Sequence, residues 1–437
     1  MFINKLILHN FRCFEDIEID FTDNLTVIVG NNGAGKTSIL EGGVIAASSM
    51  FLGLDGVTSG SIVSSDALIK SFKLGMEFDD DTQSQYPVEI TAEGDITGGI
   101  EWKRSLNGKD GKTTIVNANS IKNLSRKYQD RLRNGDESLI LPMIAYYGTG
   151  RLWDNHRAKR VSSFITNTRT NGYIDCLDGT ASLKLMDEWF EKKTIQKYQY
   201  KEVGKGSVHE LDIVYKAMEA CFSEVTGYTD VKIQYNLNMQ ELVVYYTDKE
   251  KNIRIPLRLL SAGYKGTISL IADIAYRMTV LNPQLKENVL TETSGIIFID
   301  EVDLHLHPTW QQRILDDLMK IFPNIQFVIS THAPAVINSV HSNNLRVLNE
   351  LEVYEVTQQV YGNDVNSILN NIMGAKERPI AVSNLFKEYY LELNKGEFDK
   401  AEIILDTIEK LRGDSDKEIA GCRVKLKLER IRKGGQA

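Results

Sequence analysis

The sequence predicts an α/β fold with buried strands around a phosphate-binding loop, and two observations support this prediction. An apolar run at 25–29 leads into a glycine-rich loop that ends in Lys36 and Thr37, and a helical pattern follows. A second apolar run, at 296–299, ends in two adjacent carboxylates, Asp300 and Glu301. A strand, a glycine-rich loop and a helix in this order are typical of proteins that bind nucleotide phosphates.

Length and composition narrow the function classes. A chain of 437 residues is too long for one ordinary core, so we expect two or three structural units. The formal net charge of −8 disfavours a globally basic nucleic-acid binder, although a local basic patch stays open. The four cysteines share no metal-type spacing, which fits a reduced, cytoplasmic protein. No apolar run reaches the roughly 18 residues of a membrane-spanning helix, so we expect no membrane partner.

The N-terminal 29 residues alternate between apolar and polar side chains and predict three short strands. In the loop that follows, glycines let successive backbone N–H groups face a phosphate, Lys36 can reach the β- and γ-phosphates, and the Thr37 hydroxyl can bind Mg²⁺. The alternative is a glycine-rich turn that binds nothing. The residues expected to surround the nucleotide phosphates are Asn31, Asn32, Gly33, Ala34, Gly35, Lys36, Thr37 and Ser38.

Arg12 lies between the first two expected strands. Its guanidinium could neutralise a phosphate, or it could be a surface side chain on a hairpin, and the spacing alone favours neither interpretation.

The middle of the chain predicts smaller elements. Alternation at 87–106 indicates a β-hairpin, and 110–138 is polar with a basic helix whose charged face is either solvated or a nucleic-acid contact. A buried strand at 139–147 ends in a Gly-containing turn, which we expect at the edge of the active site. Helices are expected at 182–193 and 209–225, and strands at 231–235, 242–247 and 253–257.

A second cluster of candidate residues begins at Ser261, a natural helix N-cap that precedes Gly263. With the free N–H groups of the helix it would form a second anion site. Neighbouring side chains at a strand end point to opposite faces, so Asp300 can hold Mg²⁺ through a water while Glu301 points at the γ-phosphate and activates a water. The alternative is a strand followed by a polar turn.

Four further residues end or follow strands. His332 ends the buried strand at 324–330, beside the carboxylate strand, where it can sense the γ-phosphate. Asp303, His305 and His307 could suggest a metal site, but for the two histidines a packing or interface edge is the favoured interpretation.

Together these motifs resemble those of the ABC-type ATPases of the RecF/SMC kind. In that family residues 30–37 would be Walker A, 296–301 Walker B with its catalytic glutamate, 260–265 the signature motif, and His332 the switch histidine. Arg12 resembles the N-terminal basic residue that touches nucleotide phosphates. The resemblance implies an ABC-type head with an antiparallel lobe and a helical insertion, which binds ATP and Mg²⁺. No glutamine stands in the 147–153 turn, where the family has its Q-loop.

A closer resemblance is to the ATPase subunit of Septu-type anti-phage systems, including the retron-associated ones. It is carried by the turn at 145–153, the segment 361–369 and the helical C-terminus. It implies a separate HNH nuclease partner and, in the retron version, DNA or RNA. It also implies a homo-oligomer, because Ser261 and Gly263 would complete the ATP site of a second copy.

We therefore expect four regions and an ATP hydrolase that is not itself a nuclease. The regions are 1–50 with Walker A, 51–255 with the antiparallel lobe and a basic helical insertion, 256–380 with the signature, Walker B and switch histidine, and 381–437 as a C-terminal helical hairpin for docking. The competing function is a RecF-like repair ATPase that binds DNA ends or gaps. A self-contained nuclease of the Toprim kind would need an Asp-x-Asp on a strand after His332, which 346–437 does not offer.

Overall fold

The computed structural model describes residues 1–73, 80–95, 99–152, 168–179, 183–204, 208–374, 379–413 and 416–434. The chain divides into two compact units, Met1–Asn363 and Asp364–Ala437. The sequence places its last boundary at 380/381, so the short helix α10 (Val365–Asn371) falls in the second unit of the structure rather than in the third expected region.

A six-stranded sheet forms the centre of the first unit, in the order β15-β14-β3-β13-β12-β8. All neighbours pair in parallel except β15, which is antiparallel to β14. Every residue of β3, β8, β12 and β13 is buried, which explains why these strands appear in the sequence as predominantly apolar runs. The strands are β3 (Leu25–Gly30), β8 (Met143–Tyr147), β12 (Gly295–Ile299), β13 (Ile325–Thr331), β14 (Leu345–Asn349) and β15 (Glu352–Glu355).

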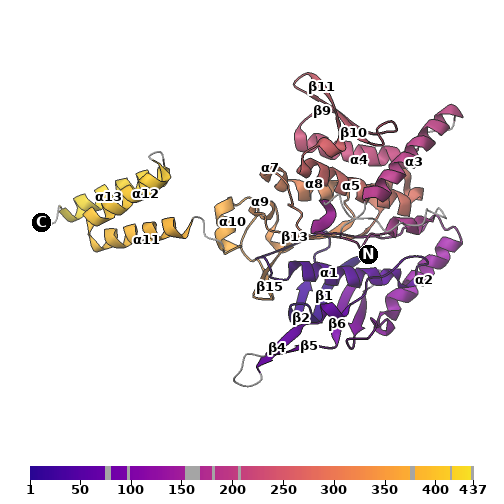
Figure 1. Ribbon diagram of the computed structural model, residues 1–437, viewed down its shortest axis with the longest axis horizontal. Helices are drawn as coiled ribbons and strands as arrows, with labels where there is room; N and C mark the ends of the chain where they lie inside the picture. The colour runs from indigo at the N-terminus through magenta and orange to yellow at the C-terminus, as the bar shows by residue number, and fades with distance from the viewer. Residues whose placement is uncertain are drawn as a thin grey trace. The chain divides into compact units, whose positions relative to one another are not determined.

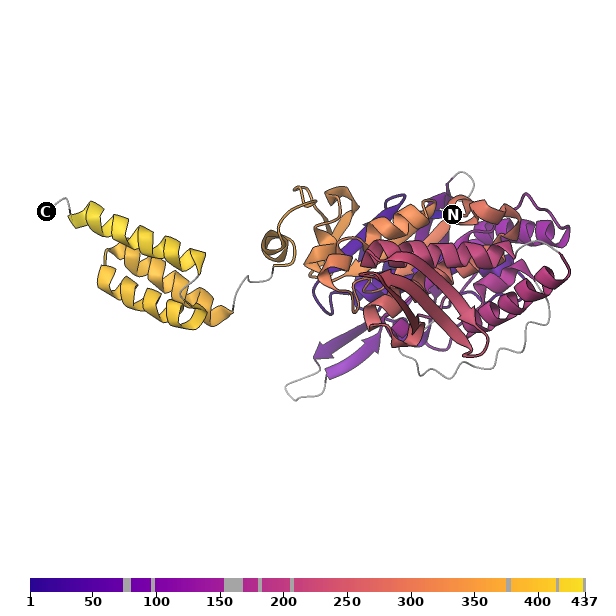
Figure 2. The same cartoon turned by 90° about the horizontal axis from the view of Figure 1, so that it is seen from above.

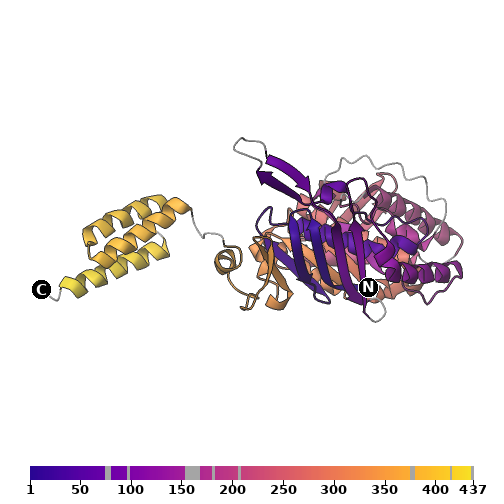
Figure 3. The ribbon, with the colours of Figure 1, turned by 90° about the horizontal axis from the view of Figure 1, so that it is seen from below.

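A second sheet is antiparallel, in the order β2-β1-β6-β7, and Figure 3 shows its strands side by side. Its alternating sequences place one set of side chains in the core, as in β2, where Phe14, Ile17 and Ile19 are buried between exposed neighbours. This sheet is the antiparallel lobe that the sequence predicts. Its strands are β1 (Phe2–Phe11), β2 (Phe14–Asp20), β6 (Val88–Asp95) and β7 (Ile100–Leu106), and a separate hairpin pairs β4 (Ile69–Lys73) with β5 (Asp80–Ser84).

Helix α1 (Lys36–Ala47) lies between the two sheets (Figure 1). A Cβ atom on Gly42 would come 2.7 Å from the side chain of Leu8 in β1, and one on Gly43 would come 2.5 Å from Phe298 in β12. Adjacent glycines thus let the helix approach both sheets closely. A helix that is apolar on all sides is a core helix, and this one is buried over nearly its whole length.

Gln326 joins the two sheets. Its side chain is fully buried in β13, and its Oε1 accepts a hydrogen bond from the Ile3 N–H (2.9 Å). Its Nε2 donates to the carbonyls of Ile3 and Thr22, both at 2.8 Å. A polar side chain inside a strand is thereby fully paired, as a buried amide must be.

The helical part of the first unit packs around α5, which is buried along most of its length and lies against α4. A three-stranded antiparallel sheet, β11-β10-β9, lies along α4 (Figure 2). The bounds are α3 (Leu183–Glu202), α4 (His209–Thr226), α5 (Ala262–Leu281), β9 (Thr229–Asn236), β10 (Glu241–Asp248) and β11 (Lys251–Pro256).

The sequence from Pro308, a residue that favours the first turn of a helix, predicts one helix to about Phe322, but the structure has two. The Arg313 N–H bonds to the Trp310 carbonyl, three residues back, and this tighter turn separates α7 from α8. Within the described ranges, none of the helices combines the length and apolar character that crossing a bilayer needs. The remaining helices of this unit are α2 (Asn119–Arg133), α6 (Val289–Glu292), α7 (Pro308–Gln311), α8 (Ile314–Ile321) and α9 (Pro334–Ile337).

The second unit contains the expected helical hairpin, α11 (Ile380–Lys395) and α12 (Phe398–Arg412), and adds α13 (Lys417–Gly434). Gly396 ends α11 with a φ of 85°, a conformation that glycine adopts without strain. The three helices share one core, which includes Tyr389, Leu393, Leu405, Ile408, Ile419, Cys422 and Leu426.

Candidate nucleotide-binding site

The phosphate-binding loop leaves β3 at Gly30 and enters α1 at Lys36. Gly33 and Gly35 have φ values of 80° and 103°, in the left-handed region that side chains rarely adopt. A Cβ on Gly35 would also collide with the Phe14 ring of the antiparallel sheet. The loop residues at 31–33 are exposed, so their backbone and the N-terminus of α1 are open to an anion.

The Lys36 side chain is folded back onto this loop. Its ammonium donates to the carbonyls of Gly30 and Asn31, both at 3.0 Å. Burial lowers the pKa of Lys36, and the nearby carboxylates of Asp300, Glu301 and Asp303 oppose that shift. The lysine therefore lies within electrostatic reach of the carboxylates that follow β12.

Asp300 connects the ends of several strands. One carboxylate oxygen accepts from the Thr37 hydroxyl at 2.7 Å, and the other accepts from the Ser330 hydroxyl at 2.5 Å. The Asp300 N–H donates to the Tyr147 carbonyl at the end of β8 (2.8 Å). A hydroxyl and a carboxylate in contact are the hard oxygen donors that Mg²⁺ prefers, so Thr37 and Asp300 fit a magnesium ion.

Glu301 has an unusual backbone. Its φ is +48°, which is uncommon for a residue with a side chain, and its N–H donates to the Ser330 hydroxyl at 2.8 Å. Such strained residues cluster at functional sites, where the surrounding structure holds them in place. The half-buried side chain stands beside the buried Asp300.

His332 follows β13 and is held through its backbone. Its N–H donates to the Asp303 carboxylate at 3.4 Å, and the neighbouring Thr331 hydroxyl donates to the same oxygen at 2.5 Å. Burial lowers the pKa of His332, and the charge of Lys36 lowers it further, against the opposing charges of Glu301, Asp303 and Asp300. The structure thus brings His332 into the same electrostatic environment as Lys36 and the two carboxylates.

Sequence reasoning missed Ser330 as a site residue, and it considered Asp303 only as a possible metal ligand. Ser330 bonds both the Asp300 carboxylate and the Glu301 N–H, and Asp303 holds the Thr331–His332 segment. The available signal was a polar residue, Ser330, at the end of an otherwise apolar run, directly before the candidate histidine. For His305 and His307, no group of three or more His, Cys, Asp or Glu within the described ranges could hold a metal ion.

Arg12 is engaged by acidic side chains. Its guanidinium pairs with Glu41 of α1 and with the buried Asp66, the latter at 3.1 Å, and its N–H donates to the Asp66 carbonyl at 2.6 Å. These contacts fix Arg12 against α1, one helical turn after the phosphate-binding loop. Contact with a phosphate stays a prediction.

Ser261 and Gly263 lie at the start of α5, and they differ in their exposure to solvent. Ser261 is the exposed N-cap residue, but its hydroxyl forms no capping hydrogen bond. Gly263 is buried, and a Cβ there would come 2.7 Å from the His305 carbonyl. Among the described residues, no hydrogen bond joins the Ser261 hydroxyl to the residues around Lys36 and Asp300.

A buried polar cluster links β8 to α5. The Tyr147 hydroxyl donates to Asp273 at 2.8 Å, and Arg277 pairs with the same carboxylate at 2.7 Å. Arg277 also donates to the carbonyls of Gly172 (3.0 Å) and Ile174 (2.7 Å). Part of the turn expected at the active-site edge, including Trp153, lies outside the described residues.

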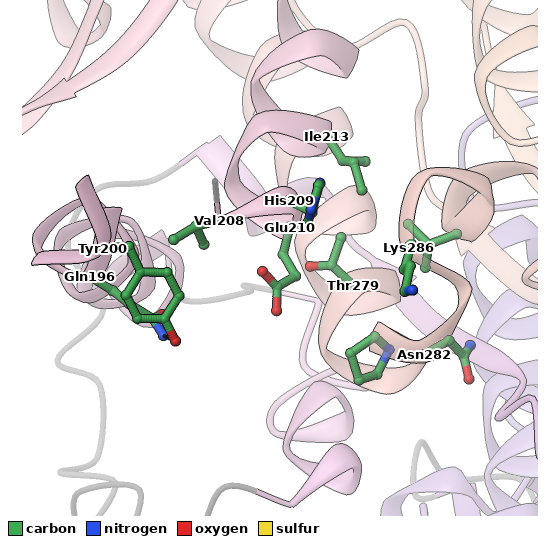
Figure 4. Close-up of a pocket in the computed structure, with 11 residues that line it drawn as sticks. Gln196, Tyr200, Val208, His209, Glu210, Ile213, Thr279, Asn282 and Lys286 are labelled. Atoms are coloured by element: carbon green, nitrogen blue, oxygen red, sulfur yellow. Dashed lines mark hydrogen bonds between the residues drawn. The ribbon is translucent and has the colours of Figure 1, made fainter. Parts of the chain in front are cut away.

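A pocket of about 230 Å³ opens elsewhere, between α3, α4 and the C-terminal end of α5 (Figure 4). Gln196 and Tyr200 face it from α3, and His209 and Glu210 face it from the start of α4. None of its lining residues belongs to the phosphate-binding loop or the carboxylate cluster.

Comparison with known proteins places this site in a family. Residues 5–250 match the family described as AAA domain, and 178–338 match "AAA domain, putative AbiEii toxin, Type IV TA system". The chain is 26% identical to the retron Vc95 probable ATPase of Vibrio cholerae, over 91% of this chain and 84% of that protein.

Two further likenesses accompany these matches. The chain is 26% identical to the Septu protein PtuA of Bacillus mycoides over 90% of its own length, which is about half (48%) of that relative. The SMC head solved with the C-winged helix domain of ScpA superposes with a TM-score of 0.47 at 14% identity, over 82% of this chain and 99% of that one.

The first family match covers more than half of the chain and includes the loop with Lys36 and Thr37. Together with the parallel sheet and its carboxylate strand, it confirms the expected ABC-type ATPase. The chain belongs to the AAA-domain family of ATPases.

Proposed function

We propose that this ATPase is the nucleotide-hydrolysing subunit of an anti-phage defence complex, and that it binds and regulates a separate HNH-type nuclease without being a nuclease itself. The observation that carries the ATPase chemistry is the contact of Asp300 with Thr37 and Ser330. The defence assignment is supported by the similarity to retron and Septu proteins along 90% or more of this chain.

In this proposal the loop at 31–38 and the Lys36 ammonium bind the β- and γ-phosphates of ATP. Lys36 would exchange its bonds to the Gly30 and Asn31 carbonyls for bonds to phosphate oxygens. Thr37 and Asp300 would hold Mg²⁺, which neutralises phosphate charge when bound. Arg12 would reach a phosphate from the adjacent hairpin by exchanging its pairing with Glu41 or Asp66 for a phosphate oxygen.

Glu301 would be the general base. Its backbone is held in the left-handed region by the Ser330 hydroxyl, which fixes where the carboxylate can reach. It would take a proton from the attacking water, while His332 contacts the γ-phosphate from the neighbouring strand. The lowered pKa of His332 keeps its imidazole neutral near pH 7, so it would act as a hydrogen-bonding group.

Ser261 and Gly263 would complete the ATP site of a second copy. Ser261 is exposed with no capping bond, and the nearby Leu259 is 57% exposed, so this end of α5 is available to another chain. A homo-oligomer with shared sites follows from this proposal. The similarity to retron ATPases extends it to DNA or RNA carried by the complex.

The test is Glu301→Gln, which keeps size and hydrogen bonding but removes the base. We expect unchanged ATP binding and hydrolysis slowed by about 100-fold or more. Glu350→Gln is the matched control, because Glu350 also has a left-handed backbone (φ 51°) but is exposed and lies after β14. Hydrolysis by Glu301→Gln at the parental rate would remove Glu301 from the mechanism.

A further inference from the structure

Helix α13 has an inner face that is occupied. Ile419, Cys422 and Leu426 recur every three or four residues and are buried in the core shared with α11 and α12. The buried positions centre on one side of the helix, as a period of 3.6 residues requires. The second unit thus needs only this face of α13 for its own stability.

The outer face of α13 carries a second apolar stripe. Val424, Leu428 and Ile431 are 58%, 61% and 72% exposed, and their spacing of four and three residues aligns them along the helix. At 100° per residue they lie opposite the buried face. A helix that presents one apolar stripe to its own core and another to solvent is typical of a docking element.

The charges of α13 fall into two groups. Arg423 pairs with Asp406 (2.7 Å) and Glu409, and Arg430 pairs with Asp399 (2.7 Å) and Glu402 (3.1 Å), all on α12. The acidic residues of α12 therefore neutralise these two arginines within the unit. The basic C-terminal segment is in this respect less available to nucleic acid than its sequence suggests.

The second group borders the outer stripe. Lys427 lies on one side of it, and Lys425 and Arg432 lie on the other, by the same helical geometry. Lys425 also lies over the Tyr390 ring (5.0 Å), and Arg432 is 3.6 Å from Glu429. The border is thus predominantly basic around three exposed apolar side chains.

The basic border decides which occupant fits. Two copies of α13 packed stripe to stripe would bring lysines against lysines, which is unfavourable. A nucleic-acid backbone would match the charge but would leave the apolar side chains in water. A protein surface with an apolar centre and a rim of carboxylates matches both features.

We propose that the stripe of Val424, Leu428 and Ile431 is the surface on which the nuclease subunit docks, through an apolar patch rimmed by Asp and Glu. This inference rests on the proposed function and adds to it the location and chemistry of the contact. Because the stripe faces away from the core, it can be altered without disturbing the fold.

The experiment uses the full chain with the double substitution Leu428→Asp and Ile431→Asp. We expect binding of the purified nuclease subunit, measured by calorimetry, to weaken at least about 30-fold, the scale of losing interface anchors. The thermal midpoint and ATP hydrolysis should not change. The matched control is Ile403→Asp on α12, which is 67% exposed and off the stripe, and should bind as the parent does.

A second variant tests the border. Lys427→Glu should weaken nuclease binding and flatten its dependence on salt, because it reverses one charge facing the acidic rim. If Lys427→Glu instead loses only single-stranded DNA binding, the surface is a nucleic-acid contact and the proposal is wrong.

The other outcomes are equally distinct. Equal nuclease binding by the parent and the double variant overturns the docking surface and leaves the proposed function standing. Failure of the nuclease to bind even the parent overturns both. A lower mass of the double variant alone in light scattering would show that the stripe contacts a second copy, which also overturns the assignment.

Discussion

The carboxylate cluster and the N-terminus of α5 differ in how completely the single chain satisfies their polar groups. In the carboxylate cluster, Asp300 is 3% exposed, and both of its carboxylate oxygens accept hydrogen bonds from Thr37 and Ser330. At the N-terminus of α5, Ser261 is exposed, its hydroxyl forms no capping bond, and Leu259 beside it is largely solvent-accessible.

This difference has a physical basis. A buried charge is tolerated only when it is paired or hydrogen-bonded, so Asp300 must be satisfied as the chain folds. An exposed helix N-terminus can be satisfied by water until an anion arrives. The carboxylate cluster is therefore set by folding, whereas the N-terminus of α5 can be set by association with another chain.

The largest expected effect comes from substituting Ser261 at the exposed N-terminus of α5. Ser261→Arg should leave ATP binding intact but lower ATP hydrolysis about 100-fold, because it blocks a hydrogen-bond donor at the shared site. Lys36→Ala removes the other half of the proposed shared site, which is the lysine of the phosphate-binding loop. In mixed dimers one site stays intact, with Lys36 from the first variant and Ser261 from the second, so ATPase assays of the mixture should show partial recovery.

The control for this mixture is each variant alone at the same total concentration. Verified mixed dimers without any recovery would mean that Ser261 does not act on the site of a neighbouring chain.

The next effect concerns Lys36 of the phosphate-binding loop, which lies beside the carboxylate cluster that folding completes. Lys36→Ala alone should weaken ATP binding by about 10- to 100-fold, the range for a lost charge-assisted hydrogen bond. Nucleotide affinity by fluorescence titration checks this. Lys320→Ala is the control, since Lys320 is exposed on α8 and pairs with Glu224. Parental affinity in Lys36→Ala would contradict the assignment of the loop.

A smaller effect tests whether α5 is connected to the carboxylate cluster inside one chain. The Tyr147 carbonyl accepts a hydrogen bond from the Asp300 N–H, and the Tyr147 hydroxyl donates to Asp273, well inside α5. Tyr147→Phe should cost about 1 kcal/mol of stability and lower kcat several-fold at unchanged KM. Tyr173→Phe loses a comparable buried hydroxyl bond, to the Pro142 carbonyl, without this connection.

The comparison between these two tyrosines is decisive. If Tyr173→Phe lowers kcat as much as Tyr147→Phe, the effect is general destabilisation and the connection has no functional role.

The smallest effect is electrostatic. Because burial and Lys36 lower the pKa of His332, its imidazole should titrate below 6.5 in the free chain, and bound triphosphate should move that pKa upward. The unfolded chain binds this proton first as pH falls, so the contribution of His332 to stability declines as pH drops through 6.5. The pKa of His332 is measured by following the NMR chemical shifts of its imidazole against pH, with and without ATP. A pKa that ATP leaves unchanged would place His332 away from the phosphate.

Sequence reasoning located those parts of the site that are contiguous in the chain. The loop at 30–37 and the pair Asp300–Glu301 each follow an apolar run, and the structure confirms the α/β fold around them. Ser330 and Asp303 act through partners some 30 residues away, and Tyr147 meets Asp273 across 126 residues. Such contacts depend on strand order, which no local pattern specifies. For the same reason the sequence could not show that Arg12 faces Glu41 and Asp66.

The Gln326 side chain has a mechanical consequence for the first unit. Sliding the antiparallel sheet past the parallel sheet would strip hydrogen bonds from the backbone of Ile3 and Thr22, and each lost pairing costs about 1 to 3 kcal/mol when buried. These bonds resist sliding of one sheet past the other. They couple β1 to β13, the strand that leads into His332.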